Sequence, residues 1–260
     1  MNELRDKVAI ITGGGHGIGK AIAHAYAGEG AAIVIAARNV PAMEEACAEL
    51  KRRGARAIHV QTNVANESDC ARMVERTVEE FGRVDILVNN AGVAGPTAKL
   101  TEISFAQWQE VIDINLTGCW LASRAALPVI ARGGGGHIVN VSSLAGREAY
   151  PMRSPYAASK WAMIGLTQTL AAEWGRSGVR VNAISPGPVA GARIEEVIKA
   201  RARAMGLEEE QVRRSIVGRS ALQRMVTEEE CARVALFLVS ADSAAVTGQT
   251  INVDAGIAMS

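Results

Sequence analysis

Tyr156 and Lys160, four residues apart in the segment SPYAASK, form the pair in this chain best suited to proton transfer. On a helix this spacing puts both side chains on one face about one turn apart, so both can meet a common ligand. A phenol has a pKa near ~10, and bringing it to ~7 means favouring the phenolate by about 4 kcal/mol, which a partly buried ammonium nearby can supply. The pair indicates an acid/base site, although the same spacing also occurs on helices without catalytic roles.

A glycine-rich turn near the N-terminus gives that chemistry a context. The segment TGGGHGIG, residues 12–19, directly follows an apolar β-branched run and precedes a helical one. Gly13, Gly17 and Gly19 lack a Cβ, which lets the chain turn tightly, lets its amides approach a pyrophosphate and lets the helix pack against the strand. A glycine cluster alone is more often a plain turn, but its place between strand and helix favours a variant of the dinucleotide-binding fingerprint.

Apolar, strand-like runs alternate with amphipathic helical stretches along the whole chain. The sequence predicts strands at 7–12, 31–37, 57–61, 84–90, 137–142, 179–185 and 249–254, with helices at 41–53, 67–81, 104–130, around Tyr156 and near 227–240. This alternation predicts an α/β fold, a doubly wound seven-stranded parallel sheet with helices on both faces. No Pro/Ser-rich linker divides the chain, so we expect one domain over residues 1–260, with GGGG at 133–136 as a helix-to-strand turn.

Composition agrees with a well-cored protein, since 48% of the residues are hydrophobic and 21% are charged. A net charge of +1 gives no electrostatic reason to expect nucleic acid or a membrane surface as partner. The chain shows no signal-peptide pattern and no apolar run approaching about eighteen residues, so we expect a cytoplasmic protein. Neither a metal site nor a disulfide framework is expected, because no paired spacing relates the cysteines or histidines: Cys47, Cys70, Cys119, Cys231, His16, His24, His59 and His137.

The chain resembles the short-chain dehydrogenase/reductase family over essentially its whole length. The motifs that carry the resemblance occur in the family's order and spacing: TGGGHGIG, NNAG at 89–92, Asn115, Ser143, YAASK and NAISPGPV. The resemblance implies a Rossmann fold and an NAD(P)-dependent oxidoreductase that interconverts a secondary alcohol and a ketone by hydride transfer.

In that family Tyr156 would exchange a proton with the substrate oxygen, and Ser143 would hold the same oxygen by a hydrogen bond. Lys160 would lower the pKa of the tyrosine and bind the nicotinamide ribose, and Asn115 would hold a water that relays protons to Lys160. Without the tyrosine and lysine, Ser143 would be interpreted as a loop cap and Asn115 as a buried polar residue bonded to backbone.

The resemblance also implies a set of cofactor contacts. Asn63 stands where the family often has an aspartate for the adenine amine, and its amide oxygen can still accept that bond. Asn90 and Gly92 would lie on the adenosine side of the cofactor, although an asparagine-containing turn is common in its own right. The expected contacts are Gly13, Gly15, His16, Gly17, Ile18, Gly19, Arg38, Asn39, Asn63, Val64, Asn90, Ala91, Gly92, Tyr156, Lys160, Pro186, Gly187 and Val189.

The end of the second predicted strand, IAARN, bears on which cofactor binds. An NAD enzyme would present a carboxylate there to the ribose hydroxyls, whereas this chain has Ala37 at that position, followed by Arg38. A guanidinium can bind a 2′-phosphate, and His16 can add a donor or partial charge. NADP is favoured and NAD is possible, since Arg38 can also be a solvated helix-start residue and His16 a loop side chain.

Residues 188–218 form a long, charge-rich segment that in relatives covers the active site as a lid. Gly191 stands where many relatives have a threonine that bonds the nicotinamide carboxamide. Arg193, with Arg147 and Arg153, could clamp an anionic substrate. The alternative is that most of these arginines are solvated or paired with acids of the same region, namely Glu148, Glu195 and Glu196.

Several functions remain open at this stage. A 3-oxoacyl-carrier-protein reductase is a narrower case of the carbonyl reductase expectation. A nucleotide-binding sensor or scaffold without turnover is an alternative from another class, and a sugar-nucleotide epimerase or dehydratase is a third, disfavoured by the short C-terminal region. Relatives usually form homotetramers through the helices bearing Asn115 and Tyr156 and through the last strand, and small helix residues in this chain permit such packing.

Overall fold

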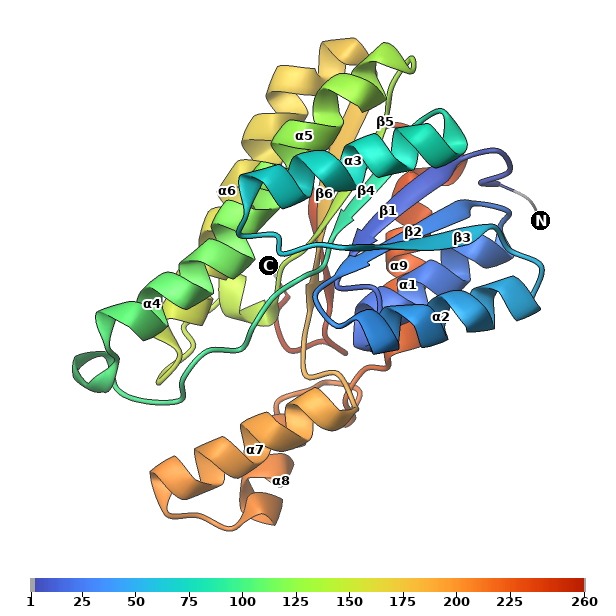
Figure 1. Cartoon of the computed structure of the whole chain (residues 1–260). Coiled ribbons are helices and arrows are strands. Elements are labelled where there is room, and N and C mark those ends of the chain that lie inside the picture. Colours follow the sequence, from blue (N-terminus) through green and yellow to red (C-terminus); the bar gives the residue numbers. More distant parts are fainter. Residues whose placement is uncertain (1–2, 260) are drawn as a thin grey trace.

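The protein, described here by a computed structural model over residues 3–259, is built on one seven-stranded parallel sheet. The strand order is β3-β2-β1-β4-β5-β6-β7, which confirms the predicted doubly wound sheet (Figure 1). Because the order reverses between β1 and β4, the carboxyl ends of these two strands flank the crevice where such folds bind ligands. The strands are β1 (Val8–Thr12), β2 (Ala32–Ala37), β3 (Ala57–Gln61), β4 (Ile86–Asn89), β5 (Gly136–Val141), β6 (Val179–Pro186) and β7 (Thr250–Val253).

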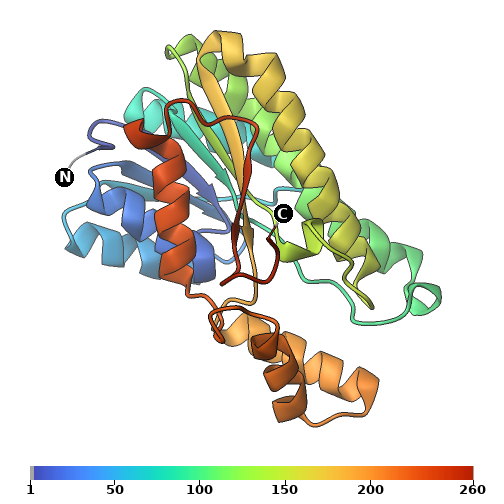
Figure 2. The ribbon, with the colours of Figure 1, turned by 180° about the vertical axis from the view of Figure 1, so that it is seen from behind.

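Helices cover both faces of this sheet (Figures 1 and 2). In β1, Ala9 and Ile11 point into one apolar core while Val8 and Ile10 point into the other, as the two-residue side-chain period of a strand requires. The first core lies under α1 (Gly17–Gly28), α2 (Val40–Arg52) and α9 (Glu228–Val239), and the second under α3 (Glu67–Phe81), α5 (Gly118–Arg132) and α6 (Ser154–Trp174).

The helix predicted over 104–130 is interrupted. It consists of α4 (Phe105–Ile112), a π-helical turn over Asp113–Thr117, and α5. A π turn widens the helix by one residue and is common at functional sites. Asn115 lies inside this turn and is fully buried, so the interruption sets the direction of a predicted site residue.

Phe105–Arg132 is also the one helical segment within residues 3–259 that is long and apolar enough, by composition, to cross a membrane. Of its most apolar stretch of 18 residues, 56% are buried within the protein. Leu121, Ala122 and Ala126 of this segment belong to the core between α5 and the sheet, which accounts for its apolar character.

The turn from α5 to β5 is the predicted glycine run. Gly134 and Gly135 have φ of 93° and 108°, a region that residues with a Cβ rarely adopt. A Cβ at Gly136 would lie 2.2 Å from the Asp85 carbonyl oxygen, so glycine is required there for close packing.

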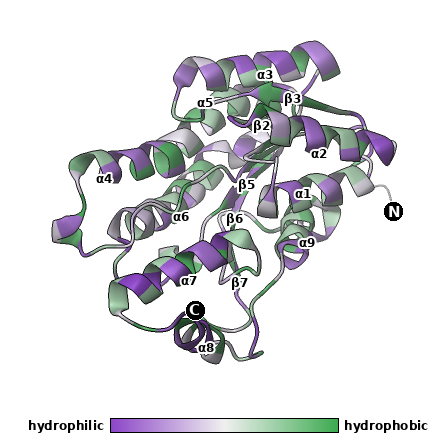
Figure 3. Cartoon of the chain, turned by 60° about the horizontal axis from the view of Figure 1, so that its bottom comes forward, coloured by the Kyte–Doolittle hydropathy of each residue, from purple (hydrophilic) through white to green (hydrophobic). Residues whose placement is uncertain are grey.

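Two further helices, α7 (Ala192–Met205) and α8 (Glu209–Gly218), project from the carboxyl edge of the sheet (Figures 1 and 2). They share a small apolar core of their own: Ile194, Ile198, Ala202, Val212 and Ile216. Hydrophilic segments interrupt α7 along its length (Figure 3). Short 3₁₀ turns complete the described chain at Leu100–Glu102, Leu144–Gly146, Gly175–Ser177 and Ala241–Ser243.

Candidate active site

Tyr156 and Lys160 lie near the start of α6, where the helix meets the carboxyl edge of the sheet. Lys160 is 4% exposed, and its ammonium donates a 2.7 Å hydrogen bond to the Val141 carbonyl oxygen at the end of β5. The Lys160 nitrogen lies 5.8 Å from the centroid of the Tyr156 ring. The predicted pair is therefore assembled on one helix face, with the ammonium fixed by backbone beneath the phenol.

Charges around Tyr156 favour its phenolate. Burial raises the pKa of the phenol, but the Lys160 ammonium lowers it, followed by the charge of Arg193 and a hydrogen bond with Ser143. The guanidinium of Arg153, whose Cζ atom lies 5.5 Å from the ring centroid, lowers the pKa further. The net pKa of Tyr156 lies below its ordinary value, while burial holds the pKa of Lys160 below its own. A phenol of this kind can give and take a proton nearer neutral pH.

Ser143 lies at the N-cap of the 3₁₀ turn after β5. Its hydroxyl oxygen accepts a 3.2 Å hydrogen bond from the Ala145 amide and also takes part in the hydrogen bond with Tyr156. The hydroxyl therefore caps a loop, as one interpretation of the sequence has it, and it also borders the phenol.

Asn115 links the π turn to two other elements. Its side-chain oxygen accepts from the Val93 amide at 2.8 Å, and its side-chain nitrogen donates to the Val93 carbonyl oxygen at 3.0 Å and to Ser159 Oγ at 3.2 Å. A Cβ added at Gly92 would lie 3.1 Å from the Asn115 oxygen and 3.9 Å from the Lys160 nitrogen. Asn115 therefore holds the chain after β4 beside Lys160, which matches the alternative of a buried polar residue bonded to backbone.

The glycine-rich turn is held by two residues at the ends of β1 and β4. Asn90 donates from its side-chain nitrogen to the carbonyl oxygens of Thr12 and Gly13, at 2.9 and 3.1 Å. The Thr12 hydroxyl accepts from the amides of Asn90 and Ala91, both at 3.0 Å, and donates to the Val88 carbonyl oxygen. Asn90 is thus a brace for the turn, and Thr12 is a site residue that the glycine pattern alone did not single out.

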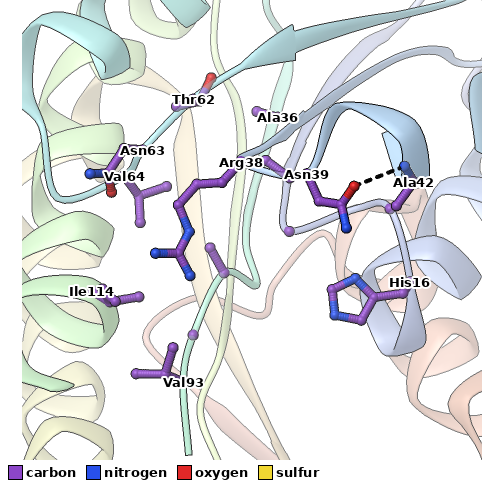
Figure 4. A pocket seen from close by; sticks show the side chains of 15 residues that line it. His16, Ala36, Arg38, Asn39, Ala42, Thr62, Asn63, Val64, Val93 and Ile114 are labelled. Carbon is purple, nitrogen blue, oxygen red and sulfur yellow. Dashed lines mark hydrogen bonds between the residues drawn. The ribbon is translucent and has the colours of Figure 1, made fainter. Parts of the chain in front are cut away.

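A pocket of about 340 Å³ opens between this turn and the ends of β2 and β3 (Figure 4). Nine of the expected cofactor contacts line it: Gly13, Gly15, His16, Arg38, Asn39, Asn63, Val64, Ala91 and Gly92. Ala36, Ala37, Ala42, Thr62, Val93 and Ile114 complete the lining. Its place at the sheet's switch point, beside a turn where a Cβ at Gly13 would meet Asn90 at 2.9 Å, fits the adenosine half of a dinucleotide.

Comparison with known proteins agrees with this geometry. The profile of the family described as Enoyl-(Acyl carrier protein) reductase matches residues 13–258. The 3-oxoacyl-[acyl-carrier-protein] reductase of Synechocystis sp. is 38% identical, with 100% of both chains covered. The chain belongs to the short-chain dehydrogenase/reductase family. It is therefore an oxidoreductase of that family, which uses a nicotinamide cofactor.

Two other members extend the comparison. The cis-4-hydroxycyclohexanecarboxylate dehydrogenase of Sinomonas cyclohexanicum is 38% identical, with 96% of each chain covered. The crystal structure of NAD⁺-bound xylitol dehydrogenase superposes with a TM-score of 0.96 at 31% identity, covering 98% of this chain and 100% of that one. The match confirms the predicted Rossmann fold of a short-chain dehydrogenase/reductase.

The polar side chains that line the pocket differ in whether the protein already binds them by hydrogen bonds. Arg38 is exposed and extends into the pocket, with His16 on the other side (Figure 4). The Asn39 side chain caps α2 by accepting from the Ala42 amide at 3.2 Å, and the Asn63 oxygen accepts from the Ala65 amide at 3.2 Å. Arg38 and His16 are therefore the basic side chains of the lining, on opposite sides of the pocket.

The remaining predicted cofactor contacts lie around the pocket rather than in its lining. Gly17 begins α1 with a φ of 60°, and Ile18 packs against the first core. Gly19 is buried, and a Cβ added there would lie 2.4 Å from the Asn90 side chain. Pro186 ends β6 and Val189 bridges to Val226. An added Cβ at Gly187 would lie 2.7 Å from the Asp254 Cβ.

Gly191, where many family members have a threonine, has a φ of 146°. A Cβ there would also come within 3.3 Å of a Glu228 carboxylate oxygen. A threonine would be strained in this backbone, so the departure from the family pattern is built into the local conformation.

The three acids suggested as partners of the arginines bind other cations, while the exposed Arg193 fits the solvated alternative. Glu148 is bound by Arg219 at 2.6 and 2.7 Å, Glu195 by Arg213, and Glu196 by Lys199 at 3.5 Å. Arg213 reaches Glu195 from α8, Arg219 lies just after the end of α8, and Lys199 lies one turn after Glu196 on α7.

Proposed function

We propose that this protein interconverts a secondary alcohol and a ketone, with Tyr156 as the acid/base. The observation that carries the proposal is the phenol of lowered pKa, fixed between Lys160 and Ser143 at the same edge of the sheet as the pocket beside the glycine-rich turn. A bound nicotinamide would supply the hydride for carbonyl reduction or accept it in alcohol oxidation.

In the direction of oxidation, the Tyr156 phenolate takes the proton of the alcohol hydroxyl as the hydride leaves the adjacent carbon. In reduction, the phenol donates that proton to the carbonyl oxygen. Ser143 donates to the same oxygen and orients it, and the Lys160 ammonium keeps the phenolate stabilised without leaving the Val141 carbonyl. We also propose that a water near Asn115 relays protons to Lys160.

We propose NADP(H) as the preferred cofactor. None of the described residues that line the pocket is acidic, and Arg38 and His16 flank its opening. A guanidinium forms strong bidentate hydrogen bonds with a phosphate, and the missing carboxylate removes the repulsion that an NAD enzyme would exert.

A narrower proposal is the reduction of a 3-oxoacyl thioester, which the similarity to the 3-oxoacyl-[acyl-carrier-protein] reductase favours. Residues 188–218 would serve as the lid. Two contacts join this part of the chain to the loop before Tyr156. Arg201, within the segment, has its guanidinium carbon 4.6 Å from the Tyr150 ring centroid, and Arg219, directly after the segment, forms an ion pair with Glu148.

For the assembled protein we propose a homotetramer in the cytoplasm. Trp120 on α5 is 45% exposed and Trp161 on α6 is 50% exposed. A subunit contact would bury these large apolar side chains. The four cysteines are buried, free thiols, as suits a reducing compartment. Sedimentation analysis of Trp161→Glu against the unchanged protein tests the contact, because an intact tetramer in the variant would contradict this interface.

The function is tested by following NADPH and NADH oxidation with a panel of ketones, keto acids, sugars and 3-oxoacyl thioesters, beside direct cofactor titration. The proposal expects reduction of at least one carbonyl class, faster with NADPH. Tight cofactor binding without reduction of any carbonyl would favour the sensor alternative, and no cofactor binding would remove the proposal altogether.

A further inference from the structure

Arg153, three residues before Tyr156, is a buried arginine whose hydrogen-bond partners are neutral. It is 3% exposed, and its terminal nitrogens donate to Thr97 Oγ1 at 3.2 Å and to the Ala94 carbonyl oxygen at 2.8 Å. Its Nε atom is buried and has no hydrogen-bond partner among residues 3–259. A buried cation is costly unless an opposite charge lies nearby, so this guanidinium gains from an anion that forms beside it.

The Arg153 guanidinium lies against the ring of Tyr156, with its Cζ atom 5.5 Å from the ring centroid. A second tyrosine, Tyr150, lies 6.5 Å from that ring and has an arginine of its own, Arg201, at 4.6 Å. Burial lowers the pKa of Arg153, Tyr150 and Tyr156 raise it, and Arg201 and Arg193 lower it. None of these neighbours is a carboxylate, so a tyrosine must supply any negative charge beside Arg153.

The backbone at residue 152 helps to hold Arg153 in this place. Met152 has a φ of 65°, in the left-handed region that residues with a Cβ rarely adopt, and its carbonyl oxygen accepts a 2.9 Å hydrogen bond from the Ala98 amide. With the two bonds of the guanidinium, three hydrogen bonds thus join residues 94–98 to residues 152–153. Strained backbone of this kind persists where surrounding contacts hold it, and it clusters at functional sites.

A cation in this position favours the phenolate of Tyr156 over the phenol. The negative charge of a phenolate spreads from its oxygen into the ring, so a guanidinium beside the ring stabilises that form. Burial raises the pKa of Tyr156, the Lys160 charge is the largest influence that lowers it, and Arg193 and Arg153 act in the same direction. Arg193 is exposed, and water and salt screen an exposed charge more than a buried one. Arg153 and Lys160 are therefore the two buried cations beside the phenol.

We propose that Arg153 is a positioning residue of the acid/base site, whose guanidinium serves together with Lys160 as the counter-charge of the Tyr156 phenolate. In reduction, Tyr156 gives its proton to the carbonyl oxygen and leaves a phenolate between the two cations. In oxidation, that phenolate takes the proton of the alcohol. The inference rests on the proposed function of Tyr156 and adds a second cation, which the segment 94–98 holds in place.

The test is an ultraviolet titration of the Tyr156 phenolate in the full chain. Arg153→Gln removes the charge and keeps an amide that can donate to the Ala94 carbonyl oxygen, whereas Arg153→Lys keeps the charge. Each variant is compared with the same variant carrying Tyr156→Phe, which cancels the signals of Tyr26 and Tyr150. We expect the pKa of Tyr156 to rise in Arg153→Gln and to stay close to that of the unchanged protein in Arg153→Lys.

The pH dependence of turnover is the second readout. With oxidised cofactor and cyclohexanol, 2-butanol or 3-hydroxybutyrate, kcat/KM of Arg153→Gln should be roughly 3- to 30-fold lower at neutral pH. The deficit should shrink as the pH rises, because loss of a cation raises the pKa of Tyr156 and a higher pH restores the phenolate. A purely structural role of Arg153 predicts the same factor at every pH.

Two further variants show whether the effect depends on the place of the guanidinium. Thr97→Val removes one acceptor of Arg153 and should shift the titration of Tyr156 in the same direction by a smaller amount. This variant leaves the buried arginine in the chain, so it tests the inference even where Arg153→Gln fails to fold. Arg132→Met removes an exposed arginine in the last turn of α5 and is the control that should leave the titration unchanged.

An unmoved titration in Arg153→Gln would overturn the inference, as would an unmoved titration in Thr97→Val where Arg153→Gln does not fold. An equal shift in Arg153→Lys would also overturn it, because the shape of the side chain would then be responsible. So would an equal shift in Arg201→Met, which removes the arginine beside the other tyrosine. Failure of the proposed function has a different signature, namely no turnover of any alcohol or carbonyl at any pH, although the phenolate titration still moves with Arg153.

Discussion

The Lys160 ammonium lies 5.8 Å from the centroid of the Tyr156 ring, one turn further along α6. It is held there by the Val141 carbonyl, which belongs to β5 rather than to the helix. The acid/base pair is thus fixed relative to the sheet edge that also builds the cofactor pocket. The pKa of the phenol therefore depends on a side chain anchored at the same edge of the sheet as the pocket.

Removing the Lys160 charge should raise the pKa of Tyr156. In Lys160→Met, burial continues to disfavour the phenolate while its largest opposing charge is gone. The phenolate is the form that takes a proton from an alcohol, so the pH at which oxidation accelerates should move upward. Ultraviolet titration of the phenolate, with Tyr156→Phe as the reference spectrum, measures the shift directly.

Tyr26 does not interfere with that titration, because burial raises its pKa far above the accessible range. Lys51→Met, which removes an exposed lysine on α2, is the control and should leave the titration unchanged. An unmoved pKa in Lys160→Met would mean that another charge sets the acidity of Tyr156.

Arg38→Ala should separate the two cofactors. Loss of a charge-assisted contact with the 2′-phosphate predicts roughly 10- to 100-fold weaker NADPH binding, with NADH changed by about twofold or less. Fluorescence titration of both cofactors provides the measurement. Arg53→Ala, at the exposed C-cap of α2, should affect neither, and equal losses for NADPH and NADH in Arg38→Ala would exclude phosphate recognition by Arg38.

Thr12→Val should destabilise the fold at the cofactor crevice. The methyl group that replaces the hydroxyl leaves the Asn90 and Ala91 amides without their acceptor, at a cost of roughly 2–4 kcal/mol in the free energy of unfolding. Chemical denaturation measures this loss. Thr12→Ser keeps the hydroxyl and should recover most of the stability, and a stability of Thr12→Val equal to that of the unchanged protein would show that other partners replace the hydroxyl.

The fold and the acid/base pair were predictable because their signals are local and periodic. Strand and helix runs repeat at fixed periods, and Tyr156 and Lys160 are related by a single helical turn. Arg153 and Asn115 show the limit of such reasoning. Arg153 is almost wholly buried although arginines are usually exposed, and its bonds reach Ala94 and Thr97, more than fifty residues away.

The ion-pair partners of the charged residues could not be predicted from the sequence either. Glu148 binds Arg219, 71 residues along the chain, because the end of α8 returns to the loop before α6. The π turn around Asn115 also lacks a clear sequence signal, since one extra residue only shifts the apolar positions that follow it by one place. These features follow from tertiary packing, which the periodicity of a single chain does not encode.

Turnover by Tyr156→Phe, measured beside its cofactor affinity, tests the central claim most directly. The substitution removes the hydroxyl that moves the proton and leaves the ring between Arg153 and Lys160. We expect cofactor binding within about twofold of the unchanged protein and kcat lower by roughly 10²- to 10⁴-fold with any carbonyl substrate found. Retained turnover in this variant would contradict Tyr156 as the acid/base.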